Sequence, residues 1–162
     1  MTLKVLAIAL ASVSFSASSW GQSPDDLRGT WTLDSSVIER DGAKIDQFGS
    51  GARGMMTLAP DGQFMLTIIG PDLPRFSSNN RASGTAEENK AVISKSIAMI
   101  GVYSLDLAAK ALTFKVEAST FPNWNGTEQK REIVTATKDE LKYVTGAASS
   151  GGVAMVTWKR AK

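Results

Sequence analysis

The stretch Gly29-Thr30-Trp31 has an expected partner near the other end of the chain, Thr157-Trp158-Lys159-Arg160. A Gly-x-Trp that opens the first strand, together with a basic residue that closes the last strand, is typical of a small antiparallel barrel whose end strands pair with each other. The segments between these two stretches have the pattern of successive hairpins. We therefore expect Trp31 and Arg160 to meet where the barrel closes, with Gly29 and Trp158 beside them.

Strand signals run through most of the chain after residue 26. Apolar and polar residues alternate with period 2, which is typical of half-buried strands, and turn residues such as Pro60-Asp61-Gly62 separate the segments. A capping box formed by Thr85 and Glu88 predicts one short helix over 86–95, with Val92 and Ile93 facing inward. The eight expected strands are Leu27–Val37, Met55–Ala59, Gln63–Ile69, Ser96–Leu105, Ala111–Ala118, Thr127–Ala136, Glu140–Thr145 and Val153–Arg160.

Eight strands with short connections and one short helix predict an all-β fold, an eight-stranded antiparallel up-and-down β-barrel. The interior of such a barrel is either just filled by side chains or holds one small ligand. The side chains expected inside are mostly apolar: one of Met55 and Met56, then Phe64, Leu66, Ile68, Met99, Leu112, Phe114 and Val116.

The first 21 residues have the pattern of a secretory signal peptide, with a positive start at Lys4 and an apolar run over 5–17. This run is shorter than the roughly 20 apolar residues that a membrane-spanning helix needs. We expect residues 1–21 to be a signal peptide and 22–162 to be the barrel domain. The mature protein is then expected in the periplasm or outside the cell.

The composition excludes several classes of function. Eighteen Lys and Arg against sixteen Asp and Glu leave a net charge of +2, which does not favour capture of nucleic acid or a membrane surface. The chain of 162 residues contains no Cys and no His, which excludes thiolate zinc sites, His-based metal sites and Ser-His-Asp catalysis. We expect no metal, no cofactor and no membrane anchor, and the sequence leaves the oligomeric state open.

The chain resembles the lipocalin-like domain family of the calycin superfamily over nearly all of residues 27–160. The resemblance implies the barrel fold and a cation–π contact between Trp31 and Arg160 at the barrel floor. Members of this family often carry a His pair where this chain has Phe114-Lys115, so no role of that pair is carried over. The matching stretches are Leu27-Arg28-Gly29-Thr30-Trp31, Phe48-Gly49, Pro60-Asp61-Gly62, Glu87-Glu88-Asn89-Lys90, Gly101-Val102-Tyr103-Ser104, Phe121-Pro122-Asn123-Trp124, Gly126-Thr127-Glu128-Gln129, Arg131 and Trp158-Lys159-Arg160.

The strand over 127–136 carries the most informative polar residue. If Ile133 faces inward, then Gln129 and Arg131 do so as well, because side chains alternate along a strand. An Arg inside an apolar barrel is suited to bind a carboxylate or another polar head group. The alternative is an internal ion pair with Asp or Glu, or a contact with Tyr103.

Two loops are expected near the barrel mouth. The segment 70–83 contains Arg75 and Phe76, and the loop that begins after residue 118 contains Phe121 and Trp124. These side chains, together with Phe114, are candidates to line a ligand site. The alternative for Phe121 and Trp124 is a structural role in which they plug one end of the barrel.

Three functions are compatible with this pattern. The first is a binding module for a small apolar or amphipathic molecule. The second is a cofactor-free isomerase or cyclase, with Tyr103, Glu128, Arg131 and Glu132 as acid–base candidates and no catalytic residue assigned. The third is a filled barrel without a ligand. The interior volume separates the first two functions from the third, because a cavity of several hundred Å³ with one or two polar groups supports binding or catalysis, whereas a filled core supports neither.

Overall fold

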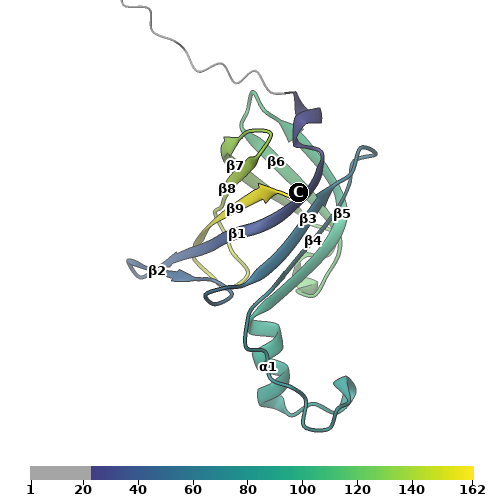
Figure 1. The fold of residues 1–162 in the computed structure, drawn as a ribbon, viewed down its shortest axis with the longest axis vertical. Coiled ribbons are helices and arrows are strands. Elements are labelled where there is room, and N and C mark those ends of the chain that lie inside the picture. Colours follow the sequence, from purple (N-terminus) through teal and green to yellow (C-terminus); the bar gives the residue numbers. More distant parts are fainter. Residues whose placement is uncertain (1–22) are drawn as a thin grey trace, which may run out of the picture.

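The computed structural model describes residues 23–162, so the predicted signal peptide over 1–21 lies outside the described residues (Figure 1). This part of the chain forms an antiparallel sheet and one α-helix, α1 (Ala86–Ser94). The strands are β1 (Gly29–Arg40), β2 (Ala43–Asp46), β3 (Arg53–Leu58), β4 (Gln63–Ile69), β5 (Ser96–Asp106), β6 (Ala111–Ser119), β7 (Glu128–Ala136), β8 (Glu140–Thr145) and β9 (Val153–Arg160).

The sheet closes into a barrel because β1 pairs with both β3 and β9. All neighbours are antiparallel, and β1 with β3 to β9 gives the predicted eight-stranded up-and-down barrel. The first strand was predicted to end at Val37, but β1 continues to Arg40. Its extra residues pair with β2, a strand that the sequence did not predict, through the turn at Asp41 and Gly42. β2 therefore lies beyond the barrel as an extension of β1.

The interior of the barrel contains the side chains that alternation placed there. Phe64 and Phe114 meet near its centre, with ring centroids 4.4 Å apart. Of the two neighbouring methionines, Met56 is buried and Met55 is exposed. Each fully buried large apolar side chain stabilises the fold by about 1.5–3 kcal/mol. The predicted interior is thus confirmed for Met56, Phe64, Leu66, Ile68, Met99, Leu112, Phe114 and Val116.

The barrel floor is closed by Trp31, which is fully buried. The guanidinium carbon of Arg160 lies 4.0 Å from the centroid of the Trp31 ring, and Arg160 Nε donates a hydrogen bond to the Lys138 carbonyl oxygen at 2.7 Å. The other two guanidinium nitrogens donate to the backbone carbonyls of Arg28 and Asp26. The cation–π contact at the seam is therefore confirmed, and it is reinforced by three hydrogen bonds to backbone oxygens.

Gly29 is required by this closure. Its φ of +117° lies in the region that favours glycine, and a Cβ atom there would lie 2.9 Å from Arg160 Nη1. Trp31 Nε1 in turn donates to the Leu27 carbonyl oxygen at 3.0 Å. Leu27 ends a 3₁₀ turn over Pro24–Leu27 and is fully buried, so the segment before β1 covers the floor.

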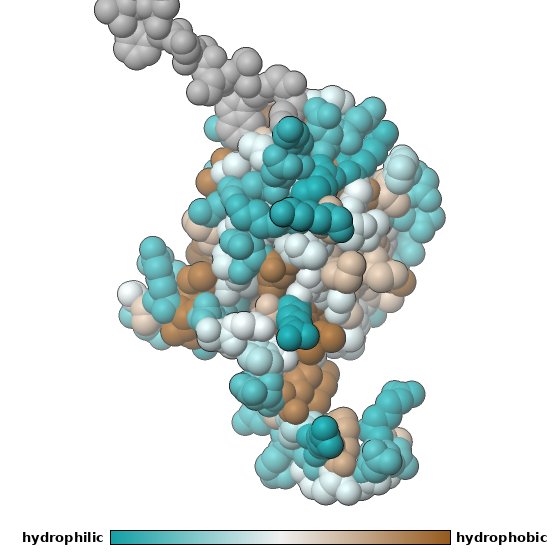
Figure 2. Space-filling model, viewed as in Figure 1, coloured by the Kyte–Doolittle hydropathy of each residue, from teal (hydrophilic) through white to brown (hydrophobic). Residues whose placement is uncertain are grey.

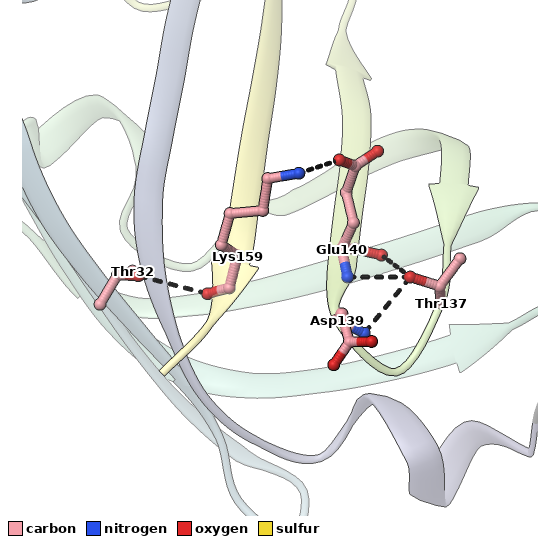
Figure 3. A network of polar contacts seen from close by, with 5 residues as sticks. All are labelled: Thr32, Thr137, Asp139, Glu140 and Lys159. Atoms are coloured by element: carbon pink, nitrogen blue, oxygen red, sulfur yellow. Dashed lines mark hydrogen bonds and ion pairs between the residues drawn. The ribbon is translucent and has the colours of Figure 1, made fainter. Parts of the chain in front are cut away.

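The polar contacts in Figure 3 flank the seam on its solvent side. Lys159 on β9 forms an ion pair with Glu140 on β8, and its backbone carbonyl accepts a hydrogen bond from Thr32 Oγ1 on β1 at 3.4 Å. Thr137 Oγ1 accepts from the backbone N–H groups of Asp139 and Glu140 at 3.3 and 2.9 Å. These contacts fix the turn between β7 and β8 beside the strand that closes the barrel.

Helix α1 projects away from the barrel on the connection between β4 and β5 (Figure 1). The predicted capping box is present: Glu88 N–H donates to Thr85 Oγ1 at 3.2 Å, and Thr85 N–H donates to the Glu88 carboxylate at 2.8 Å. The prediction that Val92 and Ile93 face inward is wrong, because α1 buries no side chain and Ile93 is 62% exposed. The helix extends past the end of the barrel and has no core beneath it.

Candidate ligand site in the barrel

Arg131 on β7 lies inside the barrel and is only 4% exposed. Alternation along β7 places it on the same face as Ile133, which is also buried. Its guanidinium carbon lies 5.9 Å from the ring centroid of Phe114 and 5.7 Å from that of Trp124. Its Nη1 donates to the neighbouring Lys130 carbonyl oxygen at 3.3 Å. The cation is therefore held among aromatic rings, where its contacts are weaker than those of a carboxylate partner.

Arg131 forms no ion pair with any carboxylate of residues 23–162; the ion pairs there are Arg28–Asp25 and Lys159–Glu140. The alternative of an internal ion pair is thus not realised in the described part of the chain. Burial lowers the pKa of the Arg131 guanidinium, and the charge interaction with Tyr143 acts in the opposite direction. Because an arginine keeps its proton in proteins, the barrel interior contains a positive charge.

Tyr143 on β8 is the second polar group of the interior. Its hydroxyl oxygen accepts a hydrogen bond from Trp158 Nε1 at 3.1 Å. Burial raises the pKa of the Tyr143 phenol, while the Arg131 charge and the Trp158 hydrogen bond act to lower it. The phenol is therefore protonated at neutral pH. No described residue accepts a hydrogen bond from this hydroxyl, so its proton is available to a bound molecule.

Arg131 and Tyr143 line the same cavity at the end of the barrel away from Trp31. The cavity measures about 40 Å³, which is room for about three water molecules at about 10–15 Å³ each. The functions predicted from the sequence require different interior volumes. With a cavity of this size, the described barrel is closer to filled than to open. Its polar lining is Ser36, Gln47, Arg131, Tyr143, Thr145 and Ser149, and its apolar lining includes Phe48, Leu66, Ile68, Ile97, Met99 and Val156.

Trp124 covers one side of this cavity. It belongs to the short 3₁₀ turn Pro122–Trp124 in the connection between β6 and β7, and it is half-buried. Its ring packs edge-on against Phe121, with centroids 5.5 Å apart. The structure thus brings Phe121, Trp124 and Arg131 into one cluster that includes Phe114 below the guanidinium.

The remaining residues that the sequence singled out lie elsewhere or contact different groups. Gln129 on β7 is half-buried, and its side-chain amide donates to Thr127 Oγ1 at 2.8 Å. The Tyr103 hydroxyl donates to the Ala59 carbonyl oxygen at 2.9 Å, on the side of the barrel that also contains Arg28 and Pro60. Arg75 is exposed on the projecting connection. Phe76 packs there against Gly84, where a Cβ would lie 2.3 Å from its ring.

Tyr143 and Thr145 are site residues that sequence reasoning missed. Both are buried and come after Leu141 at every second position of β8, so the alternation that placed Arg131 inside was a usable signal for them as well. Ser36 and Gln47, which share a hydrogen bond of 2.9 Å at the cavity wall, gave no such signal. Gln47 lies directly after β2, whose position depends on pairing beyond the barrel.

The described residues contain no group of three or more His, Cys, Asp or Glu side chains placed to hold a metal ion. In the same part of the chain, no helix is both long enough and apolar enough to cross a membrane. The lining of the cavity offers one guanidinium, one phenol, a few neutral polar groups and apolar walls. Such a site can bind and orient an acidic group on a largely apolar molecule.

Comparisons with known proteins found a family model and solved structures that resemble this chain. The family model of the lipocalin-like domain matches residues 28–161. Among solved structures, a redesigned β-barrel matches with 14% identity and a TM-score of 0.45, covering 85% of this chain and 94% of that one. A mutant of the fluorescent protein UnaG matches with 13% identity and a TM-score of 0.37, covering 85% and 98%. No curated protein matches the chain. By the match over residues 28–161, the chain belongs to the lipocalin-like domain family.

Proposed function

We propose that this protein is an exported barrel that binds one small amphipathic molecule through an acidic head group. The observation that carries the proposal is the Arg131 cation, which is buried, faces a cavity and has no carboxylate partner among residues 23–162. Buried charges are normally paired or hydrogen-bonded, because their removal from water costs several kcal/mol. A bound anion supplies the partner that the chain does not.

The geometry supports an oxyacid in particular. A guanidinium presents parallel N–H groups that match the two oxygens of a carboxylate. The Tyr143 hydroxyl offers a further donor in the same cavity, since its acceptor side is occupied by Trp158. Two donors from adjacent strands that converge on one acid group fix the orientation of the ligand.

The apolar walls limit the chemistry of the remainder of the ligand. Leu66, Ile68 and Ile97 line the same cavity as Arg131, so the part of the ligand beyond its acid group is expected to be hydrocarbon or a ring. A molecule larger than a few waters has to displace side chains around the cavity, because the cavity measures only about 40 Å³. Trp124 is the half-buried side chain that lies over Arg131, so we expect it to move.

Calorimetric titration with decanoate and with decanol tests the proposal. Decanoate is expected to bind, and decanol to bind at least about tenfold more weakly, because it lacks the second oxygen and the charge. Arg131→Met keeps the length and apolar stem of the side chain but removes the charge, and it is expected to abolish the preference for the acid. Lys130→Met is the matched control, because Lys130 is the adjacent residue on β7 and is exposed.

Two results would contradict the proposal. If Arg131→Met binds decanoate as tightly as the unmodified protein, the acid group does not contact Arg131. If neither compound nor a panel of aromatic and branched acids binds, the barrel is filled and has no ligand of this class.

Export is supported by the pattern of residues 1–21. It is tested by determining the N-terminus of protein recovered from the periplasm or medium of the producing cell. A new N-terminus at Gln22 or Ser19 is expected, and an intact Met1 in the cytoplasmic fraction would contradict it.

A further inference from the structure

The outer face of β3, β4 and β5 is almost free of charge. Each strand alternates between an inward and an outward side chain, and the central outward positions of these three strands carry no Asp, Glu, Lys or Arg. The charged outward residues of these strands lie at strand ends: Arg53 at the start of β3 and Asp106 at the end of β5. The uncharged central side chains form what we call the neutral face: Met55, Thr57, Gln63, Met65, Thr67, Ile69, Ala98, Ile100 and Val102.

The neutral face is continuous across the three strands. Thr57, Met65 and Ile100 form one row of directly paired residues, and Met55, Thr67 and Ala98 form the next. Met65 is 61% exposed and Met55 is 54% exposed. Figure 2, viewed as in Figure 1, shows white to brown surface over much of the region of β3 to β5, while teal surface is more common elsewhere.

The next strands of the sheet, β6, β7 and β8, are built differently. Their outward positions carry charges of both signs, among them Glu128, Lys130, Glu132 and Lys142. This is the usual composition of a solvated sheet face. On β6, Lys115 pairs with Val102, so Lys115 and Glu117 border the neutral face at its β5 edge. The neutral face is therefore confined to β3, β4 and β5. Its exposed apolar side chains are Met55, Met65, Ile69, Ile100 and Val102, and such a grouping on one face is typical of interaction surfaces.

We propose that the neutral face is a contact between two copies of this chain, related by a two-fold axis. In such a contact a surface meets itself, so any central charge would lie close to its own copy. A face whose charges lie at its ends, one positive and one negative, avoids this repulsion and permits Arg53 of one copy to approach Asp106 of the other. The face has no aromatic residue and no row of Lys or Arg, which disfavours a membrane surface as the occupant.

The face also carries both protruding side chains and hollows. Met55 lines a shallow hollow of about 740 Å³ beside Leu33 and Gly54. Met65 lines another of about 450 Å³ beside Gln63, with Glu117 at its β6 edge. A protruding methionine of one copy has a hollow of the other to occupy, and the flexible thioether side chain adapts to such a fit.

The area of the face limits the affinity. Three strands about 4.8 Å apart and about six residues long present about 300 Å² in plan, whereas a standard interface buries about 800 Å² per partner. Residues of β1 and of the strand ends have to supply the remaining interface area. We therefore expect a weak dimer that dissociates in the micromolar range.

Sedimentation velocity of the purified protein over a range of concentrations tests this inference. A reversible shift from monomer to dimer is expected. Met65→Lys places two like charges near the axis and is expected to weaken the dimer at least about tenfold. Met155→Lys is the matched control, because it makes the same change at a 39% exposed position on β9, and it is expected to leave the dimer unchanged.

Because Met65 is largely exposed, Met65→Lys is expected to fold; Ile100→Lys, at a 44% exposed position, is the second variant. Circular dichroism and thermal unfolding establish the fold of each variant. A monomer at every concentration would overturn the inference, as would a dimer that survives both Met65→Lys and Ile100→Lys. A dimer lost in Met155→Lys would assign the contact to another face and overturn it as well.

Discussion

Arg160→Ala tests whether the closing contact stabilises the barrel as its geometry implies. The substitution removes the cation–π contact with Trp31 at 4.0 Å and three hydrogen bonds to backbone carbonyls. A cation–π contact contributes about 0.5–2 kcal/mol, and each hydrogen bond contributes about 0.5–1.5 kcal/mol. Because these contributions overlap and the side chain is partly exposed, we expect the free energy of unfolding to fall by about 2–4 kcal/mol.

Urea unfolding followed by tryptophan fluorescence measures this loss. With a slope of about 2 kcal/mol per M, in the middle of the usual range for urea, the midpoint is expected to fall by about 1–2 M urea while the slope stays unchanged. Arg160→Lys keeps the charge but not the planar fork, so it is expected to recover only part of the loss. Lys159→Ala is the control on the neighbouring residue, whose ion pair with Glu140 lies on the surface, and it is expected to change the midpoint little.

One outcome would refute the reasoning. If Arg160→Ala shifts the midpoint no more than Lys159→Ala, then the contacts of Arg160 do not stabilise the folded barrel, and closure depends on the strand pairing and on Trp31 burial alone.

Three further predictions concern other parts of the fold. Tyr143→Phe leaves the buried indole N–H of Trp158, which donates to the Tyr143 hydroxyl, without a partner, and it is expected to cost about 1–3 kcal/mol in urea unfolding. Gly101→Ala brings a Cβ within 2.1 Å of the Lys115 carbonyl oxygen and is expected to cost about 1–3 kcal/mol, whereas Gly146→Ala meets no atom within 4 Å and is expected to leave the thermal midpoint near that of the parent. The pKa of Glu88 is lowered from 4.5, first by its hydrogen bonds from backbone N–H groups, so its stabilisation is complete above this value and is lost as the pH falls through the lowered pKa. The protection of the α1 amides from exchange, relative to unstructured peptide at the same pH, is therefore expected to fall in acid before that of the barrel strands, and in Glu88→Gln to depend less on pH.

The barrel was predictable because each of its strands has one buried face. In β6, the alternation of Leu112, Phe114 and Val116 with polar residues gives both the strand and its orientation. β2 was missed for the same reason: all four of its residues are exposed, so burial imposes no pattern on them. The helix signal for α1 was correct, but the direction of its connection, which decides whether Val92 and Ile93 are covered, depends on tertiary structure.

The candidate site was predictable only in part. The alternation of inward and outward side chains along β7 was enough to place Arg131 inside the barrel. Whether a carboxylate lies near Arg131 depends on how the strands around it are aligned with their neighbours. The pairing of β5 with β6 contains a register shift at Ile100/Gly101, and the pairing of β7 with β8 contains one at Ile133/Thr135. The relation of Tyr143 to Trp158 depends on the pairing of β8 with β9 in the same way. Sequence spacing alone does not fix such cross-strand neighbours.

The pairing of β1 with β9 also sets the order in which the chain can fold. These strands lie at opposite ends of the described chain, and contacts between distant segments form late and slowly. Until β9 leaves the ribosome, β1 and β8 each expose a row of unpaired backbone groups that other chains can join. A chain truncated before Val153 retains both open edges permanently, and its expected fate is aggregation with other copies.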